Sequence, residues 1–108
     1  MSVLFESVSI NGLEVKNRFV RSATWEGMAD ENGVCTSQLI EYMRQLALGE
    51  VGLIISGHSY VLPAGQAGFR QLGVYEDRLV PGLTDMAAAV HDAGGKIVLQ
   101  LAHAGCHA

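Results

Sequence analysis

Two short runs of alternating apolar and polar residues open the chain. The residues at 7–10 and 13–17 lie on either side of Asn11-Gly12, and Asn-Gly between two such runs is the strongest short-range signal for a β-hairpin. The sequence RFVRSAT at 18–24 is apolar and β-branched at its centre, which predicts a strand. A polar segment rich in turn-forming residues, WEGMADENGVC, follows it and is expected to be a loop.

The spacing of apolar residues becomes helical after this loop. Thr36 or Ser37 is the expected N-cap of a helix that ends at Gly49. Its apolar positions are Leu39, Ile40, Met43, Leu46 and Ala47. The continuous apolar run VGLIIS at 51–56 is bounded by glycine and predicts a strand that is covered on both faces.

A long loop separates this strand from a second predicted helix. The loop runs from Gly57 to about Asp77, and Pro81 suits the first turn of the helix. The expected buried stripe of this helix is Leu83, Met86, Ala87 and Val90. Gly94-Gly95 ends the helix, and KIVLQLA at 96–102 predicts a third strand.

The order of the predicted elements indicates an α/β fold. A hairpin is followed by strand, helix, strand, helix and strand, and such alternation is typical of parallel strands joined by right-handed crossovers. Two architectures fit this order. One is the first βα units of a TIM (β/α)8 barrel, preceded by an N-terminal β-hairpin; the other is a small doubly wound sheet.

Three strands and two helices do not cover both faces of their own sheet, and they leave apolar strand edges open. Proteins avoid such edges. We therefore expect residues 1–108 to be the first part of a longer protein, or a unit that needs a partner to complete it.

Composition narrows the functional classes. The chain is 49% hydrophobic and 17% charged, which is typical of a well-buried globular segment. Its formal net charge is -4 and it has no basic stripe, so neither nucleic acid nor a membrane is an expected partner. No apolar run approaches the ~20 residues of a membrane span. The N-terminus lacks a signal-peptide pattern, and two cysteines make no disulfide framework, so the expected localisation is cytoplasmic.

Small and polar residues follow all three predicted strands, in the sequences SATWEG, SGHSY and QLAHAG. Ligands of parallel α/β folds bind at this end of the strands. Gln100 offers a donor and an acceptor on one planar amide, which suits a heterocycle such as a flavin or a pyrimidine. A core amide satisfied by backbone groups is an equally good interpretation of Gln100 from spacing alone.

Three sequences together resemble the N-terminal third of the old yellow enzyme family, the NADH:flavin oxidoreductases. They are LFESVSINGLEVKNRFVRSAT, VGLIISGHSYVLPAG and QLAHAG, in order and with matching gaps. The resemblance implies an FMN-containing (β/α)8 barrel, of which residues 1–108 are the N-terminal part and which is incomplete in this chain. It also implies an activity in which hydride passes from NADH or NADPH through the flavin to an electron-poor alkene such as an enone.

The resemblance also implies a set of site residues. Those expected to bind FMN are Ser22, Ala23, Thr24, Trp25, Gly57, His58 and Gln100. Gly27 and His103 are expected on the substrate side, where Gly27 leaves space in place of a tyrosine of some relatives. Trp25 stands where relatives have threonine or cysteine, and Cys106 where many have arginine. No catalytic residue is assigned, because the family's substrate-binding pair and proton-donor tyrosine lie on later strands. We expect this chain alone to bind FMN weakly or not at all.

Other candidate residues have simpler interpretations. The sequence HAGCH at 103–107 has no fourth ligand nearby, so no metal site is expected. Cys35 is expected to be an inert thiol. Glu26, Asp30 and Glu31 are expected on a solvated loop. Two alternatives to the oxidoreductase stay open: a catalytically inactive α/β module that self-associates without flavin, and a doubly wound domain for another ring ligand.

Overall fold

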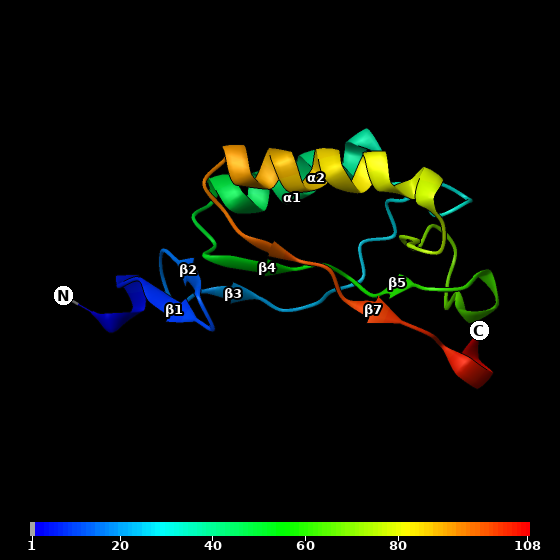
Figure 1. Ribbon diagram of the computed structural model, residues 1–108, viewed down its shortest axis with the longest axis horizontal. Helices are drawn as coiled ribbons and strands as arrows, with labels where there is room; N and C mark the ends of the chain where they lie inside the picture. Colours follow the sequence, from blue (N-terminus) through cyan, green and yellow to red (C-terminus); the bar gives the residue numbers. More distant parts are fainter. Residues whose placement is uncertain (1) are drawn as a thin grey trace.

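The computed structural model describes residues 2–108, in which a short 3-10 helix (Val3–Phe5) precedes the predicted hairpin (Figure 1). Strands β1 (Val8–Ile10) and β2 (Leu13–Val15) pair antiparallel. Asn11 and Gly12 both have positive φ, 48° and 89°, as a type I′ turn requires. The hairpin lies at the end of the molecule where the strands of the main sheet begin.

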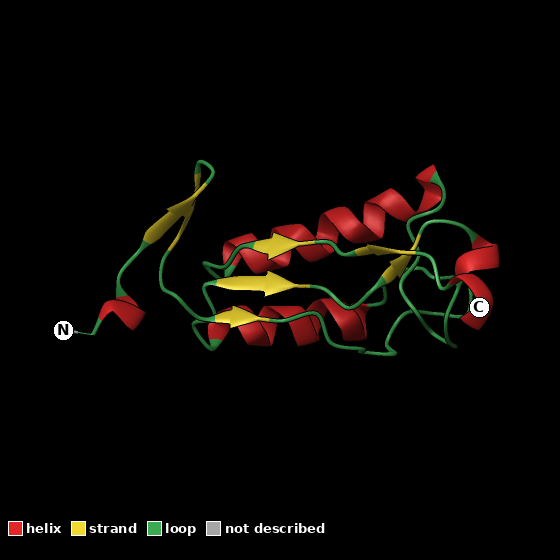
Figure 2. Cartoon of the chain, turned by 90° about the horizontal axis from the view of Figure 1, so that it is seen from below, coloured by secondary structure: helices red, strands yellow, loops and turns green. Residues whose placement is uncertain are grey.

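The main sheet is parallel and is covered by helices on one face. Strands β3 (Val20–Arg21), β4 (Leu53–Ile55) and β6 (Ile97–Val98) lie in the order β3-β4-β6. Helices α1 (Ser37–Leu48) and α2 (Val80–Asp92) pack side by side on the same face (Figure 2). Sequential strands with both helices on one face are the arrangement of a βα barrel, because a doubly wound sheet carries helices on both faces.

The third predicted strand is interrupted rather than continuous. Strands β4 and β6 end, and the two segments that follow them pair again further on as β5 (Ser59–Tyr60) and β7 (Leu101–Ala102). The break in the predicted 96–102 strand falls at residues 99–100, and the matching break after β4 falls at 56–58. The regular strand pairing is therefore interrupted at the point where the expected ligand-binding residues lie.

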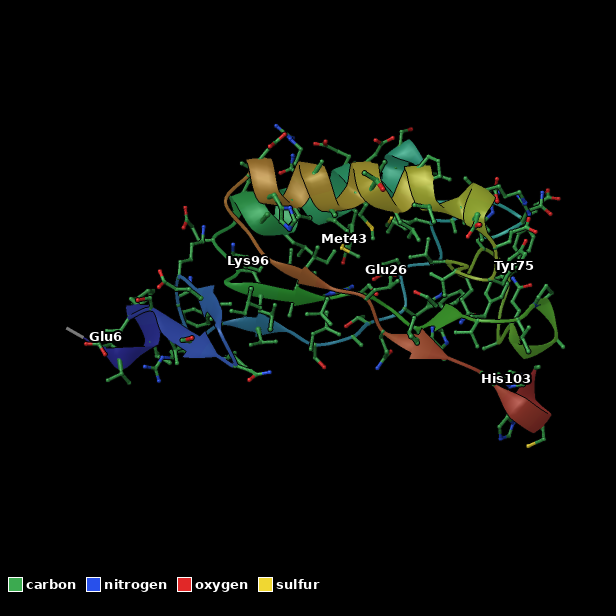
Figure 3. The ribbon with its side chains drawn as sticks, in the orientation of Figure 1. Glu6, Glu26, Met43, Tyr75, Lys96 and His103 are labelled. Atoms are coloured by element: carbon green, nitrogen blue, oxygen red, sulfur yellow. The ribbon has the colours of Figure 1, made fainter. Side chains whose placement is uncertain are left out.

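The core lies between the sheet and the two helices. Met43 of α1 points toward the sheet (Figure 3), and its side chain is fully buried with Ile54 and Val90. Helix α1 begins as predicted, because the Thr36 hydroxyl accepts a hydrogen bond from the Leu39 backbone N–H at 3.2 Å.

The opposite face of the sheet is open. Val20 and Val98 point away from the helices, since they alternate with core-facing neighbours, and they are 51% and 43% exposed. Within residues 2–108 no helix has the length and apolar character needed to cross a membrane.

Candidate functional site

A cavity of about 220 Å³ opens where the strands of the main sheet end. It is lined by Ala23, Thr24, Trp25, His58 and Gln100. These are five of the seven residues that the sequence indicated for a cofactor, and they come from the segments after β3, β4 and β6. The first and last of these segments are more than seventy residues apart in the chain, so only the parallel sheet brings them together.

Gln100 presents a free amide at this cavity. Its backbone is fixed on both sides, because its N–H donates to the Ser56 hydroxyl at 3.1 Å and its carbonyl accepts from the Ser59 N–H at 2.9 Å. Its side chain is exposed and makes no hydrogen bond within residues 2–108. Gln71 shows the contrasting arrangement, a buried amide bonded to the Ala67 N–H and the His58 carbonyl. The core-amide interpretation of Gln100 is therefore wrong.

Trp25 forms an aromatic wall of the cavity. A Cβ atom placed on Gly27 would lie 3.1 Å from its indole nitrogen, and one on Gly68 would lie 3.1 Å from the far edge of the ring. The His58 ring meets the indole edge-on at 5.5 Å. The two glycines and the histidine thus hold a half-exposed indole in one place.

Ser22 and Gly57 do not line the cavity but support its walls. The Ser22 carbonyl accepts a hydrogen bond from the Thr24 hydroxyl at 3.0 Å. The Gly57 N–H donates to the Glu26 carboxylate at 2.8 Å, so this backbone group is turned toward protein. The role of both residues toward a cofactor stays a prediction.

Glu26 corrects an expectation from the sequence. We expected it on a solvated loop, whereas its side chain is only 6% exposed and forms an ion pair of 2.9 Å with Arg21. Figure 3 shows it inside the molecule, near the ends of the strands. An arginine five residues earlier was the available signal, but nothing in the local pattern indicated that both side chains would be buried.

The two expected substrate-side residues are not among the residues that line the cavity. The space beside Gly27, which has a φ of +64°, is taken by the Trp25 indole and is not left for a ligand. The His103 ring packs against Gly65, and its Nδ1 accepts a hydrogen bond from the Gly105 N–H at 3.0 Å. Figure 3 shows His103 beyond the end of β7. The assignment of both residues to a substrate stays a prediction.

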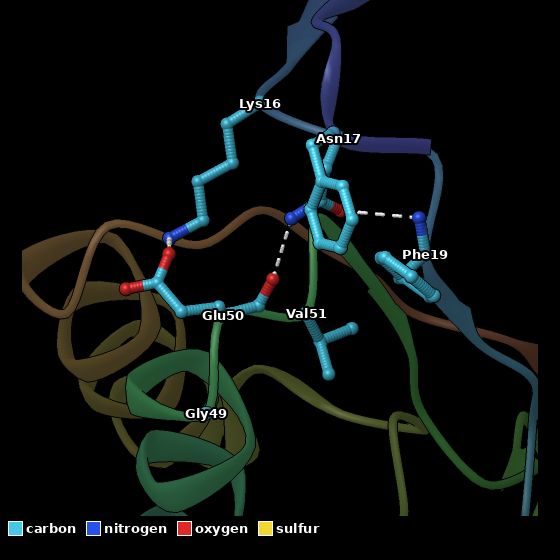
Figure 4. A pocket seen from close by; sticks show the side chains of 7 residues that line it. Lys16, Asn17, Phe19, Gly49, Glu50 and Val51 are labelled. Carbon is cyan, nitrogen blue, oxygen red and sulfur yellow. Dashed lines mark hydrogen bonds and ion pairs between the residues drawn. The ribbon is translucent and has the colours of Figure 1, made fainter. Parts of the chain in front are cut away.

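A larger cavity, of about 480 Å³, lies at the opposite end of the sheet (Figure 4). Its polar groups are already paired. The Asn17 amide donates to the Glu50 carbonyl at 2.7 Å and accepts from the Phe19 N–H at 3.0 Å, while Lys16 forms an ion pair with the Glu50 carboxylate at 3.0 Å. The N-terminal ends of barrel strands serve stability rather than catalysis, so we place the functional site at the smaller cavity.

The two cysteines are in different environments. Cys35 is buried, and desolvation, with the nearby charges of Asp85 and Glu26, raises the pKa of its thiol to about 11. Cys106 is exposed and free. Among residues 2–108 no three histidine, cysteine or acidic side chains gather closely enough to hold a metal ion.

Comparison of the structure defines the fold class. The chain superimposes on the old yellow enzyme homologue from Zymomonas mobilis with a TM-score of 0.88 and 32% identity, over 94% of this chain and 28% of that one. The solved relatives are TIM-barrel old yellow enzymes. The chain therefore has the fold of the first βα units of a TIM barrel preceded by an N-terminal hairpin, as predicted.

Sequence comparison gives the family. Residues 3–108 match the model of the NADH:flavin oxidoreductase / NADH oxidase family. The chain is 35% identical over 104 residues to the N,N-dimethylglycine/sarcosine dehydrogenase of Chromohalobacter salexigens and 41% identical over 109 residues to the metal reductase of Desulforamulus reducens. These matches cover 94% and 100% of this chain but 15% and 16% of the relatives. The chain belongs to the NADH:flavin oxidoreductase / NADH oxidase family.

Proposed function

We propose that this chain supplies one wall of an FMN site in an oxidoreductase that uses NADH or NADPH. The observation that carries the proposal is the cavity at the strand ends, where Thr24, Trp25, His58 and Gln100 meet. The FMN-binding set is Ser22, Ala23, Thr24, Trp25, Gly57, His58 and Gln100. The family supports a flavin as the ligand.

The chemistry of the lining fits a flat heterocycle. The unpaired Gln100 amide has one donor group and one acceptor, which match adjacent C=O and N–H groups on a ring edge. The Trp25 indole offers an apolar surface beside it. A cavity of about 220 Å³ receives part of such a ring and leaves the rest to other protein groups, which agrees with weak binding by this chain alone.

The proposed reaction is hydride transfer to an electron-poor alkene such as an enone. Bound FMN would supply two-electron chemistry, so that hydride from the nicotinamide could reach the alkene carbon through the flavin and a proton would complete the reduction. Residues of this chain orient the ring and cover one side of it. No residue of the chain is assigned as the proton donor. Gly27 and His103 remain the proposed substrate-side residues, and the proposed setting is cytoplasmic.

The open sheet face supports a proposed partner. Exposed Val20 and Val98, together with the free edges of β3 and β6, need a cover. We propose the remaining strands of a barrel as that cover. The same observation favours a second candidate, a self-associating module without flavin, in which another copy of the chain takes that place.

The direct test is an FMN titration followed by the fluorescence of Trp25, the only tryptophan in the sequence. We expect weak but saturable quenching of Trp25. It should exceed the loss of fluorescence that absorption of light by FMN alone causes, which the same titration of free N-acetyltryptophanamide measures. Gln100→Leu should weaken binding roughly tenfold, because it removes hydrogen bonds to the ring edge. Gln38→Leu, at an exposed position of α1, is the matched control and should bind as the unchanged chain does. Quenching that never saturates, or that Gln100→Leu leaves unaltered, would refute the proposal.

The substrate class needs its own measurement. The two curated relatives are named for an amine substrate and for metal reduction. NADH or NADPH oxidation with an enone, N,N-dimethylglycine or ferric citrate, using flavin-loaded protein in which later strands complete the barrel, would therefore separate the proposed alkene from these two alternatives. Turnover only with the amine or the metal would overturn the alkene assignment while leaving the flavin site intact.

A further inference from the structure

We propose that Glu26 is a positioning residue that fixes two walls of the cavity relative to each other. With Arg21 and Gly57 it forms what we call the strand-end clamp. The part of this proposal that concerns flavin rests on the proposed function. The part that concerns the walls themselves rests only on the geometry of this chain.

The strand-end clamp joins the ends of two neighbouring strands. One oxygen of the Glu26 carboxylate accepts from the Arg21 guanidinium at 2.9 Å and from the Gly57 N–H at 2.8 Å. The guanidinium donates in addition to the Ile55 carbonyl at 2.9 Å and the Thr24 carbonyl at 3.2 Å. The segment after β3 and the segment after β4 are thereby tied to one ion pair.

Each tied segment carries a wall of the cavity. Trp25 lies between Thr24 and Glu26 in the sequence, and both of these neighbours belong to the network. His58 directly follows Gly57. The edge-on contact of the two rings, at 5.5 Å, therefore depends on the distance that the clamp sets between their backbones.

The clamp requires glycine at position 57. A Cβ atom there would lie 2.5 Å from the other oxygen of the Glu26 carboxylate and 2.6 Å from the Thr24 carbonyl oxygen. The second of these is a backbone atom that cannot rotate away. The bare backbone thus allows the Glu26 carboxylate to approach the end of β4 closely.

The burial of this charged pair indicates that its contribution is to geometry and not to net stability. The Arg21 and Glu26 side chains are 11% and 6% exposed. A buried ion pair is commonly no more stabilising than apolar residues of similar volume, because desolvation offsets its attraction. The planar guanidinium, however, fixes the direction of several hydrogen bonds at once. We therefore assign the pair to the geometry of the strand ends.

The test measures how accessible Trp25 is to acrylamide in the 108-residue chain without FMN. Because Trp25 is the only tryptophan, its quenching constant reports this wall alone. We expect the constant to rise in Glu26→Gln, which loses the charge, and to rise further in Glu26→Ala, which also loses the acceptor for Gly57. A double variant, Arg21→Met with Glu26→Gln, leaves no unpaired charge and should also show the rise. Glu41→Gln, which breaks the exposed pair with Arg44, is the matched control and should show none.

Thiol counting shows whether a variant has folded. Cys106 is exposed and Cys35 is buried, so a folded chain gives one fast-reacting thiol and an unfolded chain gives two. Variants with one fast thiol and raised Trp25 quenching support the clamp. Unchanged quenching in the folded variants overturns it, and so does unfolding of both Glu26→Gln and the double variant, since the pair would then maintain the whole fold.

An FMN titration of the same variants separates this proposal from the proposed function. If the unchanged chain shows no saturable FMN quenching, the flavin proposal fails, while the acrylamide result still decides the clamp. If it binds, Glu26→Gln should lower the affinity roughly tenfold, because the walls are no longer held in place before binding. Loosened walls with unaltered affinity would overturn the flavin part of the inference.

Discussion

The buried Ser56 hydroxyl accepts a hydrogen bond from the backbone N–H of Gln100 at 3.1 Å. The same hydroxyl donates to the Gly57 carbonyl at 3.0 Å. Both strands are interrupted at this level, and β5 and β7 begin beyond it. A side chain thus replaces the missing backbone pairing and sets where the Gln100 amide stands.

Replacement of Ser56 by alanine should therefore affect both stability and the site. The Gln100 N–H would lose its partner, which should lower the free energy of unfolding by about 1 to 3 kcal/mol. Urea denaturation followed by circular dichroism measures this change. Ser9→Ala, at an exposed position of the hairpin, should leave the midpoint nearly unaltered. Equal effects of the two changes would contradict the role given to Ser56.

Asn17 should be the most sensitive polar residue at the base of the sheet. It is buried, and its amide connects the start of β3 to the start of β4 through Phe19 and Glu50. Asn17→Ala should lower the free energy of unfolding by about 2 kcal/mol, since two backbone groups lose their partners. The same urea titration of Asn32→Ala, at an exposed loop position, is the control. A midpoint shift no larger than that of the control would show that water replaces both bonds.

Stability should fall at alkaline pH because of Cys35. The pKa of its thiol is raised from 9.0 to about 11 in the folded chain, so above pH 9 the unfolded chain releases this proton first. The folded state then holds more protons than the unfolded state, and stability decreases as pH rises from about 9 to about 11. Cys35→Ala removes this contribution. Unfolding midpoints measured across that pH range should decline less steeply for the variant, and parallel curves would contradict the assignment.

The open face of the sheet should control the oligomeric state. Val98→Lys, alone or with Val20→Lys, places charge on the exposed surface opposite the helices and should reduce any self-association of the chain. Sedimentation velocity measures the effect. Leu48→Lys, at an exposed apolar position of α1, is the control. If it alters association as strongly as Val98→Lys does, the contact lies on the helical face.

Local sequence was sufficient for the elements whose cause is local. Asn11-Gly12 adopts the positive φ values that a tight hairpin needs, and Thr36 caps α1 as its position predicted. The alternation of elements predicted parallel strands with right-handed crossovers. It left a barrel and a doubly wound sheet open, and the two helices on one face decided between them. The segments that line the cavity were expected at one edge of the sheet, because the ends of parallel strands meet there, whereas the individual residues were expected from the family resemblance.

Only the tertiary structure decided how that edge is built. The interruption of the third strand at Gln100 depends on Ser56, which is 44 positions away. The burial of Glu26 depends on Gly57, which is 31 positions away. Gly27 and Gly68 hold the Trp25 indole from two different loops. No window of neighbouring residues contains these pairings, since each is a contact between segments that the folded sheet alone brings within hydrogen-bonding or packing distance.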